Sequence, residues 1–407
     1  MKLAIRNIGQ LVTMGGPAGP RIGAQMSDIG LVQEGEIHIE HDKISFAGRR
    51  EDAPNFIADN EINAQRGLVT PGLVDAHSHA VFAGNRADEF EQRALGTSYQ
   101  EIAAQGGGIL STVRKTRAAT EAELFAESKQ HVEWMIRSGT TTAEIKSGYG
   151  LNLETELKML RVAKQLEPTG LSVIRTFLGA HTVPPEAHTK LEYLNHIIHD
   201  MLPSLAKECE FVDMFVEDNY FNQDDARRLA IHANQLGLGV RLHVDQLADL
   251  DGAALAAEIA ATSADHLEYT GSEGINTLAQ TKTFPILLPG SVYGIRSDKY
   301  PEARQMIEAG LPVVVATDFN PGSSPTPSLP FCMSLAVTKM GMSVAEALTA
   351  CTVNAAYSLK CGHEFGSLEP GKAADIVIWD LKDYREIAYY AGHSPVRQVI
   401  KFGQSIL

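Results

Sequence analysis

Eight short apolar or β-branched runs, separated by longer helical stretches, constrain the fold of this 407-residue chain more than any other feature. They occupy residues 68–80, 139–150, 171–181, 209–217, 238–246, 261–269, 283–291 and 311–321. Strands that alternate with helices in this way are typical of a parallel sheet, and eight of them predict an α/β fold, a (β/α)8 TIM-type barrel. A doubly wound sheet is the alternative, but it usually has a Gly-rich fingerprint after its first strand, which this sequence lacks.

The stretches between these runs have a helical composition, whereas both chain ends have the pattern of strands. Residues 119–138 are rich in Ala and Glu, and Thr120 is a suitable N-cap for a helix there. We therefore expect a helix in this stretch and turn-rich β structure at both ends. The strand-like segments at the ends are 34–40, 43–48, 372–380 and 395–403.

The charge balance argues against some classes of partner. Lysine and arginine number 35 and aspartate and glutamate 50, so the net charge is −15 with histidine neutral. Phosphate binding needs clustered cations, and anionic membranes attract basic segments, so we expect no nucleic acid and no membrane as a partner. No apolar run approaches the roughly 20 residues of a membrane span, and the N-terminus lacks a signal-peptide pattern, which predicts a cytoplasmic protein. Four cysteines lie far apart without a C-x-x-C pair, which predicts reduced, buried thiols: Cys209, Cys332, Cys351 and Cys361.

Histidines gather at the ends of the predicted strands, where barrel enzymes place their chemistry. Five of the fourteen histidines end a run: His77, His79, His181, His243 and His266. His77 and His79 form an H-x-H pair, and on a strand such side chains share one face about 6.6 Å apart. Together with His243 and Asp318 they form a His3Asp set, which suits one Zn²⁺ or iron ion and leaves a position for water.

Each of these candidates also has a structural alternative. The H-x-H histidines could be satisfied core histidines, and His243, which has apolar neighbours, would by itself more often be structural. Asp318 could be a helix N-cap before Pro and Ser. Arg86 lies among acidic residues and could form only a surface ion pair. The segment 106–109 is Gly-rich but is not followed by Gly-Lys-Ser/Thr, so a flexible lid is a better interpretation than a phosphate loop.

Several segments, in order along essentially the whole chain, resemble known proteins. TPGLVDAHSHAVFAG (70–84), His243 and the TDFNPG segment around Asp318 are similar to the amidohydrolase superfamily. The resemblance implies a metal-dependent barrel over residues 67–365 beside a small β-sandwich domain built from residues 1–66 and 366–407. Four further segments resemble the imidazolonepropionase family within it: GGGILSTVRKTR (106–117), EIKSGYGL (144–151), FLGAHTVP (177–184) and VATDFNPGSSP (315–325).

The resemblance also implies one metal ion per chain, zinc or iron, with the His3Asp set as its ligands. Superfamily members that hold two metals generally bridge them with a lysine at the end of strand four, where this chain has Glu217 and no lysine. Deaminases of the superfamily typically have a glutamate three residues after the third histidine. This chain has Gln246 there, which does not ionise, so the role implied is a hydrogen bond to the substrate.

For the reaction, the resemblance implies hydrolysis of the cyclic amide 4-imidazolone-5-propanoate to N-formimidoyl-L-glutamate. Asp318 is the first candidate for accepting a proton from the attacking water, and His266 is the second, because a histidine pKa is naturally near neutrality. Arg86 would anchor the substrate carboxylate. The other implied contacts involve the ring or the tail of the product: Tyr149, His181, Gln246, Asn320, Gly322 and Ser323.

Two other functions stay open, and two residues have no assigned role. The alternatives are an aminohydrolase or deaminase of another cyclic amidine or nucleobase, and a catalytically silent amidohydrolase-like scaffold. Gln246 argues against the first, and the intact His3Asp set argues against the second. Lys146 and Glu217 end predicted strands without a role that the sequence indicates. Family members are commonly dimeric, so the resemblance implies a homodimer.

Overall fold

Eight parallel strands form one of two sheets in the computed structural model, which describes residues 1–407 apart from the side chains of residues 99, 100 and 103. Hydrogen-bonded neighbours follow the chain order from β6 to β13. The first and last strands also meet, because the Asp318 amide donates to the His77 carbonyl at 2.9 Å and the His79 amide donates to the Phe319 carbonyl at 2.8 Å. The sheet is therefore a nearly closed barrel, which confirms the predicted fold class.

The barrel strands are short, and each lies within one of the eight predicted runs. They are β6 (Leu73–Asp75), β7 (Thr140–Lys146), β8 (Ser172–Ala180), β9 (Phe211–Val216), β10 (Gly239–Val244), β11 (Ser263–His266), β12 (Phe284–Leu287) and β13 (Val314–Val315).

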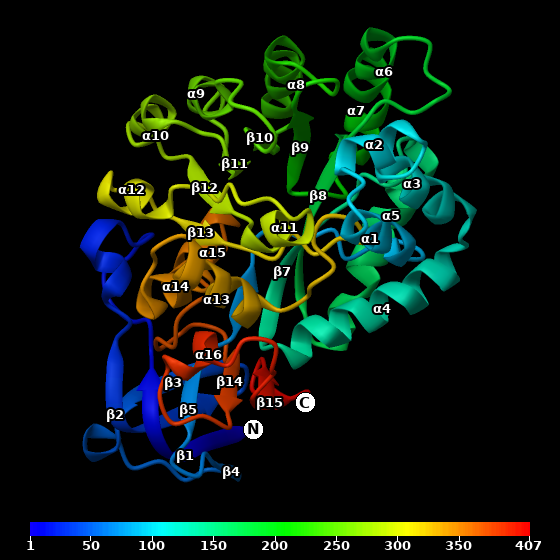
Figure 1. The fold of residues 1–407 in the computed structure, drawn as a ribbon. Coiled ribbons are helices and arrows are strands. Elements are labelled where there is room, and N and C mark those ends of the chain that lie inside the picture. Colours follow the sequence, from blue (N-terminus) through cyan, green and yellow to red (C-terminus); the bar gives the residue numbers. More distant parts are fainter.

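The second sheet joins the two chain ends, and Figure 1 shows its blue and red strands side by side below the barrel. Strand β5 pairs antiparallel with β14, with Val69 opposite Ile378. The predicted run 68–80 is therefore divided: its first residues belong to this sheet, and the barrel begins after Gly72. A Cβ at Gly72 would lie 2.1 Å from Thr141 Oγ1, so only glycine permits this close passage between the sheets. The strands are β1 (Lys2–Val12), β2 (Leu31–Glu40), β3 (Lys43–Arg49), β4 (Asn60–Asn63), β5 (Leu68–Pro71), β14 (Ile376–Trp379), β15 (Val396–Lys401) and β16 (Gln404–Ser405).

Helices surround the barrel and fill the connections between its strands (Figure 1). The predicted helix at 119–138 is α4, and the Glu123 amide donates to Thr120 Oγ1 at its start, which confirms the expected cap. The helices are α1 (Ala87–Ala94), α2 (Tyr99–Ala104), α3 (Ile109–Ala118), α4 (Glu121–Arg137), α5 (Leu153–Gln165), α6 (Lys190–His196), α7 (Leu202–Leu205), α8 (Gln223–Gln235), α9 (Gly252–Glu258), α10 (Ser272–Leu278), α11 (Pro289–Gly294), α12 (Ala303–Glu308), α13 (Leu329–Lys339), α14 (Val344–Ala350), α15 (Val353–Ser358) and α16 (Glu386–Tyr389).

Each sheet has its own apolar core. The second sheet packs Ile5, Ile37 and Ile376 together, and the barrel buries a larger cluster between its strands and the surrounding helices. All four cysteines are free and buried, as predicted. Within the described part of the chain, no helix combines the length and apolar character needed to cross a membrane.

Candidate active site

The predicted metal ligands converge at the carboxyl ends of the barrel strands. Possible ligand atoms of His77, His79 and His243 all lie within 4.8 Å of one another, as do those of His77, His266 and Asp318. Asp318 Oδ1 lies 3.3 Å from His79 Nε2 and 3.5 Å from His77 Nε2. All five side chains are buried. The structure therefore brings the His3Asp set together and places His266 against it.

The ring orientations of His77 and His243 fit a cation between them. His77 Nδ1 lies 2.6 Å from Asp265 Oδ2, and His243 Nδ1 lies 3.0 Å from Asp213 Oδ1. An ionised carboxylate only accepts hydrogen bonds, so each Nδ1 carries a proton, and each ring in its neutral form has a lone pair on Nε2. Both Nε2 atoms are buried and make no hydrogen bond with any described residue. Imidazole and carboxylate donors of this kind suit zinc or iron, so the residues present fit such an ion.

The protonation of these residues follows from burial and from their partners. Burial lowers the pKa of His243 to about 3 and also lowers that of His79. Burial acts in the same direction on His77, but its hydrogen bond to Asp265 and the nearby Asp318 carboxylate raise its pKa to about 9. Burial opposes ionisation of Asp318, whereas the adjacent His77 and His79 rings hold its pKa well below the usual range. The site therefore holds Asp318 as a carboxylate, and a cation bound there would displace a proton from His77.

Both candidates for proton transfer have a left-handed backbone conformation. The φ angle is +52° at Asp318 and +84° at His266. Residues other than glycine adopt this region rarely, and when they do they are held there by the surrounding structure. His266 Nδ1 lies 3.2 Å from Glu268 Oε1, and the Ser323 hydroxyl donates to Asp318 Oδ2 at 3.2 Å. These contacts fix the direction in which each side chain enters the site.

A small cavity lies over this cluster and gathers most of the remaining predicted site residues. It is lined by His79, Arg86, Ile109, Tyr149, His181, Phe215, His243, Gln246, His266, Asp318, Asn320 and Ser323. Ile109 and Phe215 were not among the predicted site residues, because isolated apolar residues carry no chemical signal. Ile109, the first residue of α3, is the one residue of the predicted lid segment 106–109 among those that line this cavity.

Arg86 is not a surface residue, so the alternative of a surface ion pair is wrong. Its side chain is 2% exposed, and its Nε lies 3.4 Å from Glu89 Oε2. Gly322, the one predicted contact that does not line the cavity, packs directly against it: a Cβ there would lie 0.9 Å from Arg86 Nη2. Gly322 therefore makes the space that the guanidinium occupies at the cavity wall.

Two amide groups in the loop after β13 are already hydrogen-bonded. The backbone N–H groups of Gly322 and Ser323 both donate to Asn320 Oδ1 at 2.8 Å. The Asn320 side chain also donates to Ser323 Oγ at 2.9 Å. Contacts from this loop to a ligand would therefore come mainly from side chains, with Asn320 holding the loop in shape.

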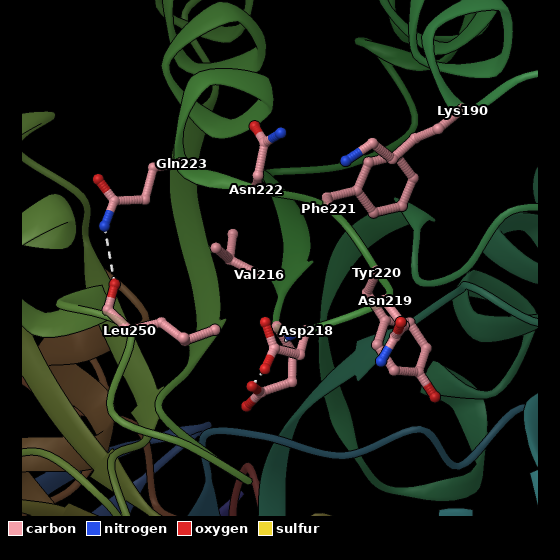
Figure 2. Close-up of a pocket in the computed structure, with 10 residues that line it drawn as sticks. Lys190, Val216, Asp218, Asn219, Tyr220, Phe221, Asn222, Gln223 and Leu250 are labelled. Atoms are coloured by element: carbon pink, nitrogen blue, oxygen red, sulfur yellow. Dashed lines mark hydrogen bonds between the residues drawn. The ribbon is translucent and has the colours of Figure 1, made fainter.

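Glu217 does not line this cavity but holds the loop that carries Gln246, which does. One of its carboxylate oxygens accepts the Leu247 amide at 2.8 Å and the other accepts the Asp218 amide at 3.1 Å, while burial raises its pKa. It thus ties the loop after β9 to the loop that carries Gln246. Glu217 also borders a separate surface pocket (Figure 2), where Gln223 Nε2 donates to the Leu250 carbonyl. None of the described residues that line this second pocket is a predicted site residue.

The sequence did not indicate the charged layer beneath the histidines. Asp213 and Asp265, which hold two of the histidines, are completely buried, and so is Lys146 between them. Glu144 and Arg241 complete the group, 3.0 Å apart. A signal was available for two of them: Asp213 in β9 and Arg241 in β10 are charged residues within otherwise largely apolar strands, which is uncommon unless the charge is paired.

The fold and the cluster define a class of protein, the metal-dependent hydrolases with a (β/α)8 barrel. The model of the Amidohydrolase family matches residues 68–406, so the chain belongs to this family. It is 48% identical to an imidazolonepropionase of Solibacter usitatus, over 99% of this chain and 98% of that protein. It is 44% identical to an imidazolonepropionase of Bacillus velezensis, over 99% of this chain and 96% of the relative.

Solved structures agree on the fold. A 5-methylcytosine deaminase from Klebsiella pneumoniae, liganded with 5-fluorocytosine, superposes with a TM-score of 0.77 at 16% identity, over 100% of this chain and 97% of that one. An adenosine deaminase from Xanthomonas campestris with bound zinc has a TM-score of 0.75 at 18% identity, over 99% of this chain and 92% of that one. At such identities the likeness concerns the fold alone.

Proposed function

We infer that this protein is a hydrolase that opens the ring amide of 4-imidazolone-5-propanoate and releases N-formimidoyl-L-glutamate, a step of histidine degradation. The observation that carries this inference is the identity of 48% and 44% to imidazolonepropionases over nearly the whole chain. The cavity supports it independently, since it combines a buried arginine with a His3Asp cluster. An anionic tail and a ring carbonyl are the two substrate groups that such a cavity can recognise.

We propose that His77, His79, His243 and Asp318 hold one ion, either zinc or iron. Their convergence and the lone pairs of the two buried Nε2 atoms support this ligand set. Such an ion supplies Lewis acidity, which polarises a carbonyl and makes water a stronger nucleophile at neutral pH. Metal analysis of protein purified from its natural host would distinguish the two elements.

The remaining residues bind the substrate and exclude bulk water. Arg86 receives the propanoate tail through a bidentate contact that suits a planar guanidinium. His181 Nδ1 donates to the Gly148 carbonyl at 3.1 Å, and burial holds the pKa of His181 well below the ordinary value. The neutral ring therefore presents Nε2 to the substrate as a hydrogen-bond acceptor. Tyr149 and Gln246 contact the ring, and Asn320, Gly322 and Ser323 shape the end of the cavity that receives the product tail.

Proton movement falls to Asp318 and His266. Asp318 is a carboxylate within 3.5 Å of two histidines, so it can accept a proton from water that enters the cluster. Water adds to the ring carbonyl carbon, the C–N bond breaks, and the leaving nitrogen must gain a proton. His266, held by Glu268, lines the same cavity close to Asp318 and is placed to pass the proton that Asp318 accepts from water to this nitrogen, which leaves both residues as they began.

Product analysis tests this function. Metal-loaded protein should remove the ultraviolet absorbance of 4-imidazolone-5-propanoate and yield N-formimidoyl-L-glutamate by NMR, without ammonia. Release of ammonia from a nucleobase or another cyclic amidine, with no action on the imidazolone, would instead identify a deaminase. Gln246 argues against that outcome, because an amide cannot move the protons that a deaminase glutamate moves.

We also propose the division of the chain and its assembly. Residues 73–365 would form the catalytic barrel domain, with residues 1–72 and 366–407 as the accompanying β domain. The boundary lies later than residue 67, which the sequence predicted, because β5 pairs within the second sheet. The protein would act as a cytoplasmic homodimer without nucleic acid. Sedimentation of the purified chain with and without added DNA tests the last two points.

A further inference from the structure

Lys146 lies inside the barrel, below the clustered histidines, with no exposed surface. Its ammonium is 2.7 Å from Asp213 Oδ2, 2.9 Å from Glu144 Oε2 and 3.6 Å from Asp265 Oδ2. These three carboxylate side chains are also completely buried. Burial lowers the pKa of Lys146, but the charges of Asp213 and Glu144 more than offset this and leave it above the usual value. The side chain is therefore a buried cation among three anions.

Two of the three carboxylates are the ones that hold histidines. Asp213 divides its oxygens, with Oδ1 on His243 Nδ1 and Oδ2 on Lys146. Asp265 uses Oδ2 for both His77 Nδ1 and Lys146. A single carboxylate therefore connects the Lys146 ammonium to each of two candidate metal ligands, His243 and His77.

The arrangement follows from the architecture of the barrel. Lys146, Asp213 and Asp265 come from β7, β9 and β11, and alternate strands of a (β/α)8 barrel contribute side chains to the same interior layer. Such layers are ordinarily filled by branched apolar residues. Replacement of a buried ion-pair group by well-packed apolar residues is often neutral or stabilising, so stability alone does not explain a charged layer here.

Arg241 is the other cation of this layer, but it is connected differently. Its Nε lies 3.0 Å from Glu144 Oε1, and its Nη2 donates to the Ala76 carbonyl at 2.9 Å. It reaches Asp265 only at 3.9 Å. Among the described ion pairs, Lys146 is the lysine or arginine that contacts both Asp213 and Asp265.

We propose that Lys146 is a positioning residue that fixes Asp213 and Asp265, and through them directs the Nε2 atoms of His243 and His77 toward the metal position. Without the ammonium, three carboxylates would face one another in a dry interior, and their repulsion would displace the two that hold the histidines. The inference rests on the proposed function only in taking the cluster as a metal site. Its test therefore measures metal binding, not hydrolysis.

The experiment compares zinc affinity, measured by competition with a chromophoric chelator, in the wild type and in Lys146→Met. Loss of a group that orients metal ligands typically weakens metal binding by about 10- to 100-fold, and we expect a loss in that range. The visible absorption spectrum of the cobalt-substituted protein should also change, because it reports the ligand geometry. Lys401→Met is the matched control, since Lys401 is a buried lysine paired with Asp375 in the second sheet. It should bind zinc as the wild type does.

A second comparison separates positioning from general damage to the fold. In an Asp213→Asn background, Lys146→Met should cause a smaller loss of zinc affinity, because one of its two routes to a histidine is already gone. Wild-type zinc affinity and an unchanged cobalt spectrum in Lys146→Met would overturn the proposal. Equal losses in both backgrounds, or the same loss in Lys401→Met, would also overturn it. Absence of zinc binding by the wild type would overturn the proposed function itself.

Discussion

The protein buries a lysine in each of its two sheets, and the surroundings of the two differ. Lys401, on β15, pairs with Asp375 and lies against the rings of Phe365 and Phe402, with its Nζ 4.5 and 4.4 Å from the ring centroids. Lys146, on β7, contacts three carboxylates and no aromatic ring among the described contacts. Both side chains are nearly or completely excluded from water.

The difference concerns where each network ends. The Lys401 network does not reach the cluster. Among the described contacts, the Asp375 carboxylate otherwise accepts the Phe402 amide at 3.1 Å and a hydrogen bond from Thr141 on β7, and neither residue is a candidate metal ligand. The Lys146 network continues through Asp213 and Asp265 to two histidines of the cluster. A buried ion pair by itself is weak evidence for function. Lys146 differs from Lys401 because its partners Asp213 and Asp265 also contact histidines that can bind a metal ion.

The largest effect on catalysis is expected from substitution of His243, which the Lys146 network reaches through Asp213. His243→Ala removes a candidate metal ligand, and the lost stabilisation of several kcal/mol corresponds to at least about a thousandfold lower kcat/KM. Steady-state hydrolysis of 4-imidazolone-5-propanoate measures this, alongside metal content. Normal turnover by a His243→Ala protein that retains its metal would show that His243 is not a ligand. The Lys146 network would then not reach a metal ligand through Asp213.

The second-sheet lysine should affect stability and leave catalysis unchanged. Lys401→Met leaves the Asp375 carboxylate buried without its cation, at a cost of about 3 kcal/mol in the free energy of unfolding. Urea unfolding measures this change, and the double variant Lys401→Met/Asp375→Asn should recover part of it. A fall in kcat at a temperature where Lys401→Met is fully folded would mean that the two lysines do not differ as described.

A smaller effect is expected from the arginine at the cavity wall, which supports substrate binding and not the metal. Arg86→Ala should raise KM by roughly 30- to 100-fold, since a charged tail loses a charge-assisted hydrogen-bond partner. Gly322→Ala should raise KM in the same direction without removing the charge, because its methyl group would overlap the position of Arg86 Nη2. Zinc affinity should stay at the wild-type value in both. If kcat falls while KM is unchanged, the carboxylate anchor lies elsewhere.

Much of the fold and of the cavity could be predicted because parallel barrels have strict geometric rules. Strands that alternate with helices place all their carboxyl ends on one rim, so His77, His181 and Asp318 could be grouped although they are far apart in sequence. The apolar wall residues Ile109 and Phe215 could not be predicted, because nothing distinguishes them from core residues.

Charged residues within apolar strands could be noticed in the sequence, but the sequence pattern could not place them together in one layer under the rim. Which strand residues point into a barrel depends on the register between strands, and a shift of one residue would turn Asp213 outward. The division of the run 68–80 between two sheets has a similar cause. Apolar residues stand on both sides of the division, Leu68 and Val69 before it and Leu73 and Val74 after it, and the close passage of Gly72 beside Thr141 separates the two parts.

The most direct test of the account follows the oxygen atom of the attacking water. Hydrolysis of 4-imidazolone-5-propanoate by metal-loaded protein in H₂¹⁸O, quenched early and analysed by mass spectrometry, should place one ¹⁸O atom in the newly formed carboxylate of N-formimidoyl-L-glutamate. The rate of labelling should fall when the metal is removed by a chelator and return when it is restored. Undiminished labelling by the metal-free protein, or product without ¹⁸O in that carboxylate, would contradict the account.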